Sequence, residues 1–226
     1  MKGKIDGQKI ARRIAEELKN YEGKPNGRIV QVGDHGPSNT FVENKLDLAE
    51  QVGFDLELEK LPGEVSQKEL EHKIRDICGS DEVDGVLVQL PLPGHLDENS
   101  VFSNIPTSKD IDGLNPENLG RTLRGMAGVR PAAVEAVIEV IDEAGIETEG
   151  AEATILNDSS LIGRPLAMEL LGRDATVTIC HENSLEIEQK IRASKIIVTA
   201  TGEQDVFDPD CVPEDALVID AGYEHG

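Results

Sequence analysis

Polar residues that could take part in chemistry occur at three places in the first half of the chain. Gln89 follows the largely apolar run of residues 83–88 and precedes Pro91 and Pro93. Proline lacks an N–H and fixes φ, so a strand formed by this run must end near Gln89. Ligands of open α/β sheets bind at the carboxyl ends of strands, which makes Gln89 a candidate binding residue. On this stretch alone, a strand that merely ends in a polar residue before a proline turn is the favoured interpretation.

The other two places are similarly ambiguous when each is taken alone. Phe41 and Lys45 are four residues apart on a predicted helix and therefore face the same way. A lysine in this setting is usually a solvated surface cation. Residues 109–113 place two carboxylates, a lysine and a glycine in five positions, which is also the composition of a polar turn that requires glycine.

The elements that would position these residues alternate between strand and helix. A helix capped by Asp6 is predicted to run to about Tyr21, and Ser38 is predicted to cap a second helix that ends before Gly53. Strands are predicted at residues 28–33, 54–61 and 83–90, and a further helix at 67–78. This β-α-β-α-β order predicts a parallel sheet.

The second half repeats the alternation. A helix is predicted from residues 130–131 to about 144, where Gly145 stops it. Strands are predicted at 151–156, 175–180, 195–200 and 216–221, with helices at 161–171 and 185–193, as in a Rossmann-like half. We therefore predict two α/β domains with a cleft between them, residues 1–120 and 121–226, joined near residues 116–131.

The net charge of −22 bears on partners and environment. Such an acidic chain repels nucleic acid and anionic membranes, so neither is expected as a partner. The carboxylates are spread along the chain and suit solubility in high salt, which favours a halophilic source.

The three cysteines, Cys78, Cys180 and Cys211, are far apart and have no zinc-ligand spacing. We expect free thiols in a reducing cytoplasm and no metal. No apolar run approaches membrane-spanning length, and no apolar signal region begins the chain.

Taken together, the three places resemble one family. The patterns are Ser38-x-x-Phe41-Val42-x-x-Lys45, Asp84-Gly85-x-x-Val88-Gln89-Leu90-Pro91-Leu92-Pro93 and Lys109-Asp110-x-Asp112-Gly113. Their order and approximate spacing resemble methylenetetrahydrofolate dehydrogenase/methenyltetrahydrofolate cyclohydrolase. Ile5-Asp6-Gly7 and Asn118-Leu119-Gly120-Arg121 are also similar, and the resemblance runs from about Ile5 to Gly222, more specific in the first half.

The resemblance implies an activity and roles for residues. The family oxidises 5,10-methylenetetrahydrofolate by hydride transfer to a nicotinamide and hydrolyses the methenyl product to 10-formyltetrahydrofolate. By this resemblance Lys45 is the central catalytic residue, Gln89 orients it, and Asp112 accepts hydrogen bonds from the pterin amino groups. A lysine in a cleft can have a lowered pKa and assist attack by water. The implied substrate-binding residues are Phe41, Leu90, Pro91 and Pro93.

Phe41 departs from the family, which usually has tyrosine there. Phenylalanine keeps a flat face for stacking on the folate ring but loses the hydroxyl. We expect folate binding to survive this change better than turnover does.

The dinucleotide loop departs further. The family's Gly-x-Ser-x-x-Val-Gly-x-Pro reads Asn157-Asp158-Ser159-Ser160-Leu161-Ile162-Gly163-Arg164-Pro165, and such a loop is also an ordinary strand–helix turn. Asn157 tolerates left-handed φ but keeps a side chain. The implied cofactor-binding residues are Asn157, Ser159, Ser160, Gly163, Arg164, Pro165, His181, Glu182 and Gly202.

NADP, the commoner cofactor of the family, is the expected dinucleotide, with NAD as the alternative. Asp158 places a negative charge where a phosphate would approach, and Glu182 could accept a hydrogen bond from a ribose 2′-hydroxyl and repel a 2′-phosphate. Both residues favour NAD. An acidified surface scatters carboxylates everywhere, however, and high salt screens repulsion, so both dinucleotides stay open.

Three hypotheses about function follow, in order of preference. The first is the bifunctional folate enzyme, for which the family resemblance implies a homodimer. The second is a cyclohydrolase-only or non-catalytic folate-binding relative with a degraded dinucleotide site, because Phe41, Asn157 and Asp158 depart from the family. The chain also ends at Gly226, several dozen residues before family members do, so a shortened, truncated second domain is expected. The third is an amino-acid or shikimate-type dehydrogenase, which explains neither the Gln89 nor the Asp112 motif.

Overall fold

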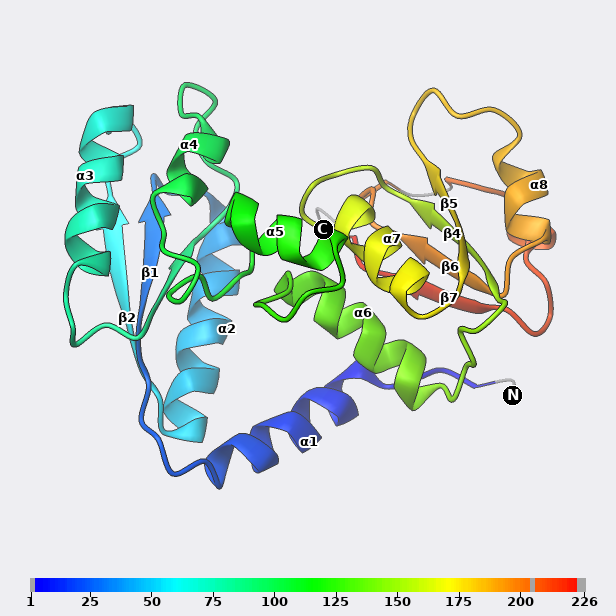
Figure 1. Cartoon of the computed structure of the whole chain (residues 1–226), viewed down its shortest axis with the longest axis horizontal. Helices are drawn as coiled ribbons and strands as arrows, with labels where there is room; N and C mark the ends of the chain where they lie inside the picture. Colours follow the sequence, from blue (N-terminus) through cyan, green and yellow to red (C-terminus); the bar gives the residue numbers. More distant parts are fainter. Residues whose placement is uncertain (1–2, 204–205, 223–226) are drawn as a thin grey trace. The chain divides into compact units, whose positions relative to one another are not determined.

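A computed structural model of the 226-residue chain describes residues 3–203 and 206–222. Two compact units are present (Figure 1). The first unit comprises residues 11–118, and in the second unit the amino-terminal segment up to Ile10 packs with the chain from Leu119 onwards. The domain boundary after residue 120 stays a prediction. The packing of the amino-terminal segment with the second unit was not predicted from the sequence. The predicted shortening of the second domain concerns the end of the chain, and residues 223–226 lie outside the described residues.

The first unit is built on a three-stranded parallel sheet with the order β2-β1-β3. Its strands are β1 (Asn26–Val32), β2 (Asp55–Leu61) and β3 (Gly85–Val88). All four residues of β3 are buried, as expected for a strand covered on both faces of a parallel sheet. The predicted β-α-β-α-β order is confirmed, although β3 is shorter than the predicted strand at 83–90.

Local sequence explains the helices between these strands. Helix α3 (Gln67–Cys78) starts with a capping box in which Ser66 and Glu69 bond reciprocally. Helix α2 (Gly36–Val52) ends at Gly53, whose φ of 82° is the left-handed cap that glycine favours. The prediction that Ser38 caps α2 is wrong, because His35 holds that position and Pro37 occupies the first turn.

Three further helices of the chain do not connect two strands of the first sheet. Helix α1 (Gly7–Lys19) follows Asp6, whose carboxylate accepts a hydrogen bond from the Gln8 N–H. Helix α4 (Glu98–Ser103), capped by Asp97, and helix α5 (Pro116–Leu123) occupy segments for which no helix was predicted. The predicted joint at residues 116–131 therefore begins with a helix.

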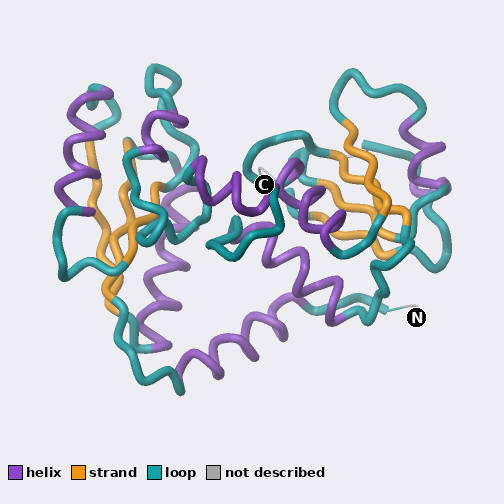
Figure 2. The backbone as a smooth tube through the Cα atoms, in the orientation of Figure 1, coloured by secondary structure: helices purple, strands orange, loops and turns teal. Residues whose placement is uncertain are grey.

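The second unit has a four-stranded parallel sheet with the order β5-β4-β6-β7 (Figure 1). Figure 2 shows its strands in orange and the neighbouring helices in purple. The chain passes from β4 to β5 on one side and returns to β6 on the other, so β4 borders the switch point at which α/β sheets bind ligands. The bounds are β4 (Glu152–Leu156), α7 (Gly163–Gly172), β5 (Thr176–Cys180), α8 (Ile187–Arg192), β6 (Ile196–Thr199) and β7 (Leu217–Asp220). Helix α6 (Ala132–Glu143) precedes them, and a 3-10 turn, η1 (Pro209–Cys211), lies before β7.

Apolar side chains from helices and strands form the core of this unit. The fully buried members include Val134, Ile141, Ile155, Leu166, Leu170, Ile196 and Val198. The predicted Rossmann-like arrangement is confirmed. Cys78, Cys180 and Cys211 are buried free thiols, and no helix in the described residues is long and apolar enough to span a membrane.

Candidate active site

Lys45 and Gln89 meet in the first unit. Lys45 lies on α2 and Gln89 directly follows β3, and the Lys45 Nζ donates a hydrogen bond of 3.0 Å to the Gln89 Oε1. Helix α2 is held over the strand ends by its first turns, because the buried Gln31 of β1 donates from Nε2 to the Asn39 Oδ1 at 2.7 Å. Two residues predicted from separate motifs therefore lie in contact.

Gln89 is itself held in place from two sides. Its backbone N–H donates to the Val30 carbonyl at 2.9 Å, which extends the ladder of the sheet by one residue. Its Nε2 donates to the Leu90 carbonyl at 2.7 Å. With the amide nitrogen bound there, the amide oxygen is left as the acceptor for Lys45, and the buried side chain has its orientation fixed.

The pKa values of Lys45 and Asp112 are shifted in opposite directions. Burial lowers the pKa of the Lys45 ammonium, and the negative charge of Asp112 partly opposes this. Burial raises the pKa of the Asp112 carboxyl, which the charge of Lys45 opposes and the charge of Asp110 reinforces. Both shifts favour the neutral forms, so this cluster can hold a lysine that gives up its proton more easily than an exposed one.

Asp110 and Asp112 have different surroundings although they share one motif. Asp110 is buried and accepts hydrogen bonds from the Leu114 N–H, the Asn115 N–H and the Asn118 Nδ2 at 3.3, 2.9 and 2.8 Å. It therefore organises the turn, while Asp112, two residues on, interacts electrostatically with Lys45. The sequence pattern singled out the motif, but it did not separate the structural carboxylate from the one beside Lys45.

Backbone requirements account for the two glycines near this turn. Gly113 has a φ of 69°, which glycine adopts without strain. A Cβ on Gly85 would lie 2.6 Å from the Ile111 Cγ1, so β3 needs glycine where the turn packs against it. The Lys109 Nζ donates to the Ser80 carbonyl at 2.7 Å and so fastens the start of the turn.

The loop after Gln89 carries three of the four predicted substrate-binding residues. The Leu90–Pro91 peptide bond is cis, Pro91 is exposed and Pro93 is half-buried. Ser38, buried inside α2, donates from Oγ to the Leu90 carbonyl at 3.3 Å and so ties this loop to the helix of Lys45. Sequence reasoning treated Ser38 as a helix cap and missed this contact. The fourth residue, Phe41, is exposed on α2.

In the second unit, Asn157 organises the loop after β4. Its Oδ1 accepts hydrogen bonds from the Ser159 N–H, the Ser159 Oγ and the Gly163 N–H at 2.9, 2.6 and 3.0 Å. Its Nδ2 donates to the Ala200 carbonyl at 2.8 Å, just past β6. The asparagine that replaces the family's first glycine thus builds the loop from its side chain. A Cβ on Gly163 would lie 1.9 Å from the Asn157 carbonyl oxygen, so glycine is required there.

A cavity of about 460 Å³ lies where β4, β5 and β6 end. The predicted cofactor residues Asn157, His181 and Glu182 line it, and Gly202 sits between two further lining residues, Thr201 and Glu203. Its position at the carboxyl ends of three neighbouring parallel strands fits a dinucleotide. The remaining lining residues are Leu156, Asp158, Cys180, Ile187 and Val206.

The other predicted cofactor residues lie elsewhere in the loop or at a second cavity. Ser160, Arg164 and Pro165 line a cavity of about 410 Å³ together with Leu119 and Leu123 of the α5 region. Ser159 is used within the loop, and Gly163 is buried at the start of α7. The nine residues therefore do not all surround one cavity.

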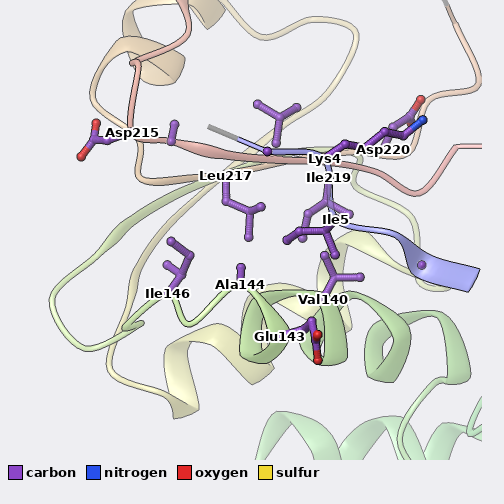
Figure 3. A pocket seen from close by; sticks show the side chains of 14 residues that line it. Lys4, Ile5, Val140, Glu143, Ala144, Ile146, Asp215, Leu217, Ile219 and Asp220 are labelled. Atoms are coloured by element: carbon purple, nitrogen blue, oxygen red, sulfur yellow. The ribbon is translucent and has the colours of Figure 1, made fainter. Parts of the chain in front are cut away.

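A third cavity, of about 630 Å³, contains none of the predicted site residues. Figure 3 shows Ile5 of the amino-terminal segment directed towards Val140 of α6, whereas the Lys4 side chain extends beside Asp220 of β7. Its lining is largely aliphatic. No cluster of metal-binding side chains is found among residues 3–203 and 206–222.

Comparison with known families matches both halves of the chain. The family described as tetrahydrofolate dehydrogenase/cyclohydrolase, catalytic domain, matches residues 3–112. The family described as tetrahydrofolate dehydrogenase/cyclohydrolase, NAD(P)-binding domain, matches residues 131–226. Between them they cover most of the chain.

Individual relatives agree. The bifunctional protein FolD of Salinibacter ruber is 37% identical over 227 residues, which cover 96% of this chain and 76% of the relative. That of Halothermothrix orenii is 38% identical over 227 residues, covering 96% and 80%. The crystal structure of the Trypanosoma brucei methylenetetrahydrofolate dehydrogenase-cyclohydrolase, complexed with NADP cofactor and inhibitor, superposes with a TM-score of 0.92 at 31% identity, covering 97% of this chain and 78% of that one.

Proposed function

The chain belongs to the tetrahydrofolate dehydrogenase/cyclohydrolase family, and we propose that Lys45, Gln89 and Asp112 form its catalytic centre. It is an enzyme that oxidises 5,10-methylenetetrahydrofolate to the methenyl form with NAD(P) and hydrolyses that product to 10-formyltetrahydrofolate. The observation that carries the proposal is the 3.0 Å hydrogen bond from Lys45 to Gln89, made by a lysine whose pKa burial lowers.

In the hydrolytic step, neutral Lys45 serves as the base. Water adds to the electron-poor methenyl carbon and passes a proton to the Lys45 Nζ. The bond from this carbon to one ring nitrogen then breaks, and the ammonium returns the proton to that nitrogen. The hydroxyl on the carbon releases its own proton to solvent as it becomes the C=O, which leaves the formyl group on the other nitrogen. Gln89 acts as a positioning residue, because its oxygen fixes where the Nζ lies.

Asp112 has two roles in this proposal. Its carboxylate accepts hydrogen bonds from the pterin amino groups, which orients the folate. Its negative charge also favours protonated Lys45, so it moderates the fall in the lysine pKa. Phe41 offers a ring face to the folate, and Leu90, Pro91 and Pro93 shape the wall of the site.

For the oxidative step, a bound dinucleotide would supply the acceptor for the hydride of the methylene carbon. The loop from Asn157 to Pro165 of the second unit would hold the dinucleotide, together with His181, Glu182 and Gly202. Asn157, Ser159 and Gly163 hold the loop in shape through the hydrogen bonds of the Asn157 amide. NADP carries over from the relatives as the expected cofactor, with NAD as the alternative.

The remaining expectations are part of the same proposal. We infer a folate-binding domain of residues 1–120 and a dinucleotide-binding domain of residues 121–226 from the resemblance, which also favours a homodimer. The buried free cysteines support a cytoplasmic location, and the net charge of −22 supports a halophilic source and the absence of nucleic-acid partners.

A paired assay on this chain in molar salt tests the function. One arm follows reduction of NAD or NADP with methylenetetrahydrofolate, and the other follows loss of methenyltetrahydrofolate absorbance without dinucleotide. We expect activity in both arms. Hydrolysis alone would support the cyclohydrolase-only alternative, which Phe41 favours because it lacks the tyrosine hydroxyl. Silence in both arms would contradict the proposal.

A further inference from the structure

The cavity at the ends of β4, β5 and β6 has an unusual charge for a dinucleotide site. Its described lining residues include three carboxylates, those of Asp158, Glu182 and Glu203, and neither lysine nor arginine. A phosphate monoester carries about two negative charges at neutral pH. Such a group would meet these carboxylates and His181 in the described lining, but no lysine or arginine.

Glu182 stands at the position that recognises ribose in Rossmann-like folds. It lies two residues after Cys180, the last residue of β5, and it lines the cavity. The Asn183 Nδ2 donates to one of its oxygens, Oε1, at 3.2 Å. A carboxylate at the end of this second strand accepts hydrogen bonds from a ribose diol and repels a phosphate on it.

The nearby basic groups offset these carboxylates only in part. The Arg164 Nη2 lies 3.9 Å from the Asp158 Oδ2, but Arg164 is exposed and lines a different cavity. The Lys190 Nζ is directed at the Leu185 carbonyl, 2.5 Å away. The His181 Nδ1 accepts a hydrogen bond from the Asn183 N–H at 3.1 Å, so this ring nitrogen does not present an N–H to a ligand.

We propose that Asp158 and Glu182 select a dinucleotide with a free ribose 2′-hydroxyl, so that this enzyme prefers NAD to NADP. This inference rests on the proposed dinucleotide site and departs from the cofactor that the relatives suggest. Glu182 accepts hydrogen bonds from the ribose hydroxyls. Asp158, across the cavity at the end of β4, adds the charge that rejects a 2′-phosphate.

Binding measured by calorimetry tests the proposal without relying on turnover. The dissociation constants of NAD and NADP are measured for the full chain, together with those of ADP-ribose and its 2′-phosphate, which lack the nicotinamide. The variants are Asp158→Asn, Glu182→Gln and the pair. Glu152→Gln is the control, because it removes one exposed carboxylate from the start of β4, at the amino end of the strand that precedes Asp158.

We expect NADP to bind at least about tenfold more weakly than NAD, since a difference of about 1.4 kcal/mol corresponds to a factor of ten. The paired variant should reduce this ratio by about tenfold, and the control should leave it unchanged. ADP-ribose and its 2′-phosphate should differ in the same way. Repeating the series in molar salt tests whether the preference is local, because a local preference persists while long-range repulsion by the acidic surface is screened.

Three results would overturn the proposal. NADP could bind as tightly as NAD, the ratio could stay unchanged in the paired variant, or the control could change it as much as the pair does. If neither dinucleotide binds, the proposed site itself is wrong, whereas hydrolysis of methenyltetrahydrofolate is unaffected. That outcome is distinct from one in which both dinucleotides bind equally well and hydride transfer proceeds.

Discussion

The Lys45 Nζ lies 3.0 Å from the Gln89 Oε1, although 44 positions separate the two residues in the chain. Gln89 can accept this hydrogen bond because its own amide nitrogen is already bound to the Leu90 carbonyl. The contact joins a helix to the end of a strand and leaves the lysine partly desolvated. A lysine that is held and desolvated in this way is suited to exchange protons with a bound substrate.

Replacing Lys45 with methionine should abolish hydrolysis while the fold stays intact. General base catalysis contributes about 10²–10⁴-fold, so the rate above the uncatalysed reaction should fall by at least about a hundredfold. Loss of methenyltetrahydrofolate absorbance gives the rate, and thermal unfolding reports the fold. Lys68→Met, at an exposed position of α3, is the matched control and should retain full activity.

Replacing Gln89 with glutamate should move the pH dependence of hydrolysis towards higher pH. The new carboxylate would favour the charged form of Lys45 and so raise its pKa from its lowered position. Activity should fall at neutral pH and recover as the pH rises. A uniform loss at every pH would mean that Gln89 acts through binding or packing, and not by controlling the proton on Lys45.

Asp112→Asn should move the pH dependence the other way, because the charge of Asp112 opposes the fall in the Lys45 pKa. The change also affects stability. The pKa of the Asp112 carboxyl is higher in the folded state than in the unfolded state. The free energy of unfolding therefore falls as the pH rises from the unfolded-state pKa through the folded-state pKa. The variant should therefore be more stable than the parent at neutral pH and equal to it at low pH, as measured by denaturant unfolding.

Replacing Asp110 should lower the free energy of unfolding at neutral pH, which is the opposite of the effect expected for Asp112→Asn. It is buried and accepts three hydrogen bonds that shape the turn. Asp110→Ala leaves these donors without their acceptor, and the free energy of unfolding should fall by about 2–5 kcal/mol. Equal effects of the changes at positions 110 and 112 would contradict the division of the two carboxylates into a structural and a functional one.

Asn157→Ala tests the loop of the second unit. The substitution removes four side-chain hydrogen bonds, so we expect a loss of about 1–3 kcal/mol in the free energy of unfolding and weaker binding of either dinucleotide. Hydrolysis, which requires no dinucleotide, should continue. Asn99→Ala on exposed α4 is the control. Unchanged dinucleotide binding in Asn157→Ala would show that the loop does not form the site.

The parts of the fold that sequence predicts best are those with local signals. Helix α3 begins and ends as expected at residues 67 and 78, because Ser66 and Glu69 form a capping box and an apolar stripe follows. Helices α4 and α5 were missed because they are short, at six and eight residues, and offer little periodicity. The packing of the amino-terminal segment with the second unit depends on contacts distant in sequence, which no local pattern reports.

In the candidate site, too, contacts between residues distant in sequence could not be predicted from local patterns. Motif spacing singled out Lys45, Gln89 and Asp112, yet it assigned Ser38 to a helix cap and took Asn157 as a weakened loop residue. Both assignments depend on where a side chain points. Ser38 is bound to the Leu90 carbonyl and Asn157 to the Gly163 N–H and the Ala200 carbonyl, and those partners lie 52, 6 and 43 residues away.

The measurement that tests the central claim most directly is the ionisation of Lys45 compared with the pH dependence of hydrolysis. Lysine labelled with ¹⁵N, assigned through the Lys45→Met spectrum, gives the pKa of the Nζ by NMR, and hydrolysis without dinucleotide gives the rate over the same pH range. We predict a Lys45 pKa below the ordinary lysine value and a rate that rises with the same midpoint. A Lys45 that titrates as an ordinary exposed lysine, or a rate whose midpoint differs from its pKa, would contradict the assignment of Lys45 as the base.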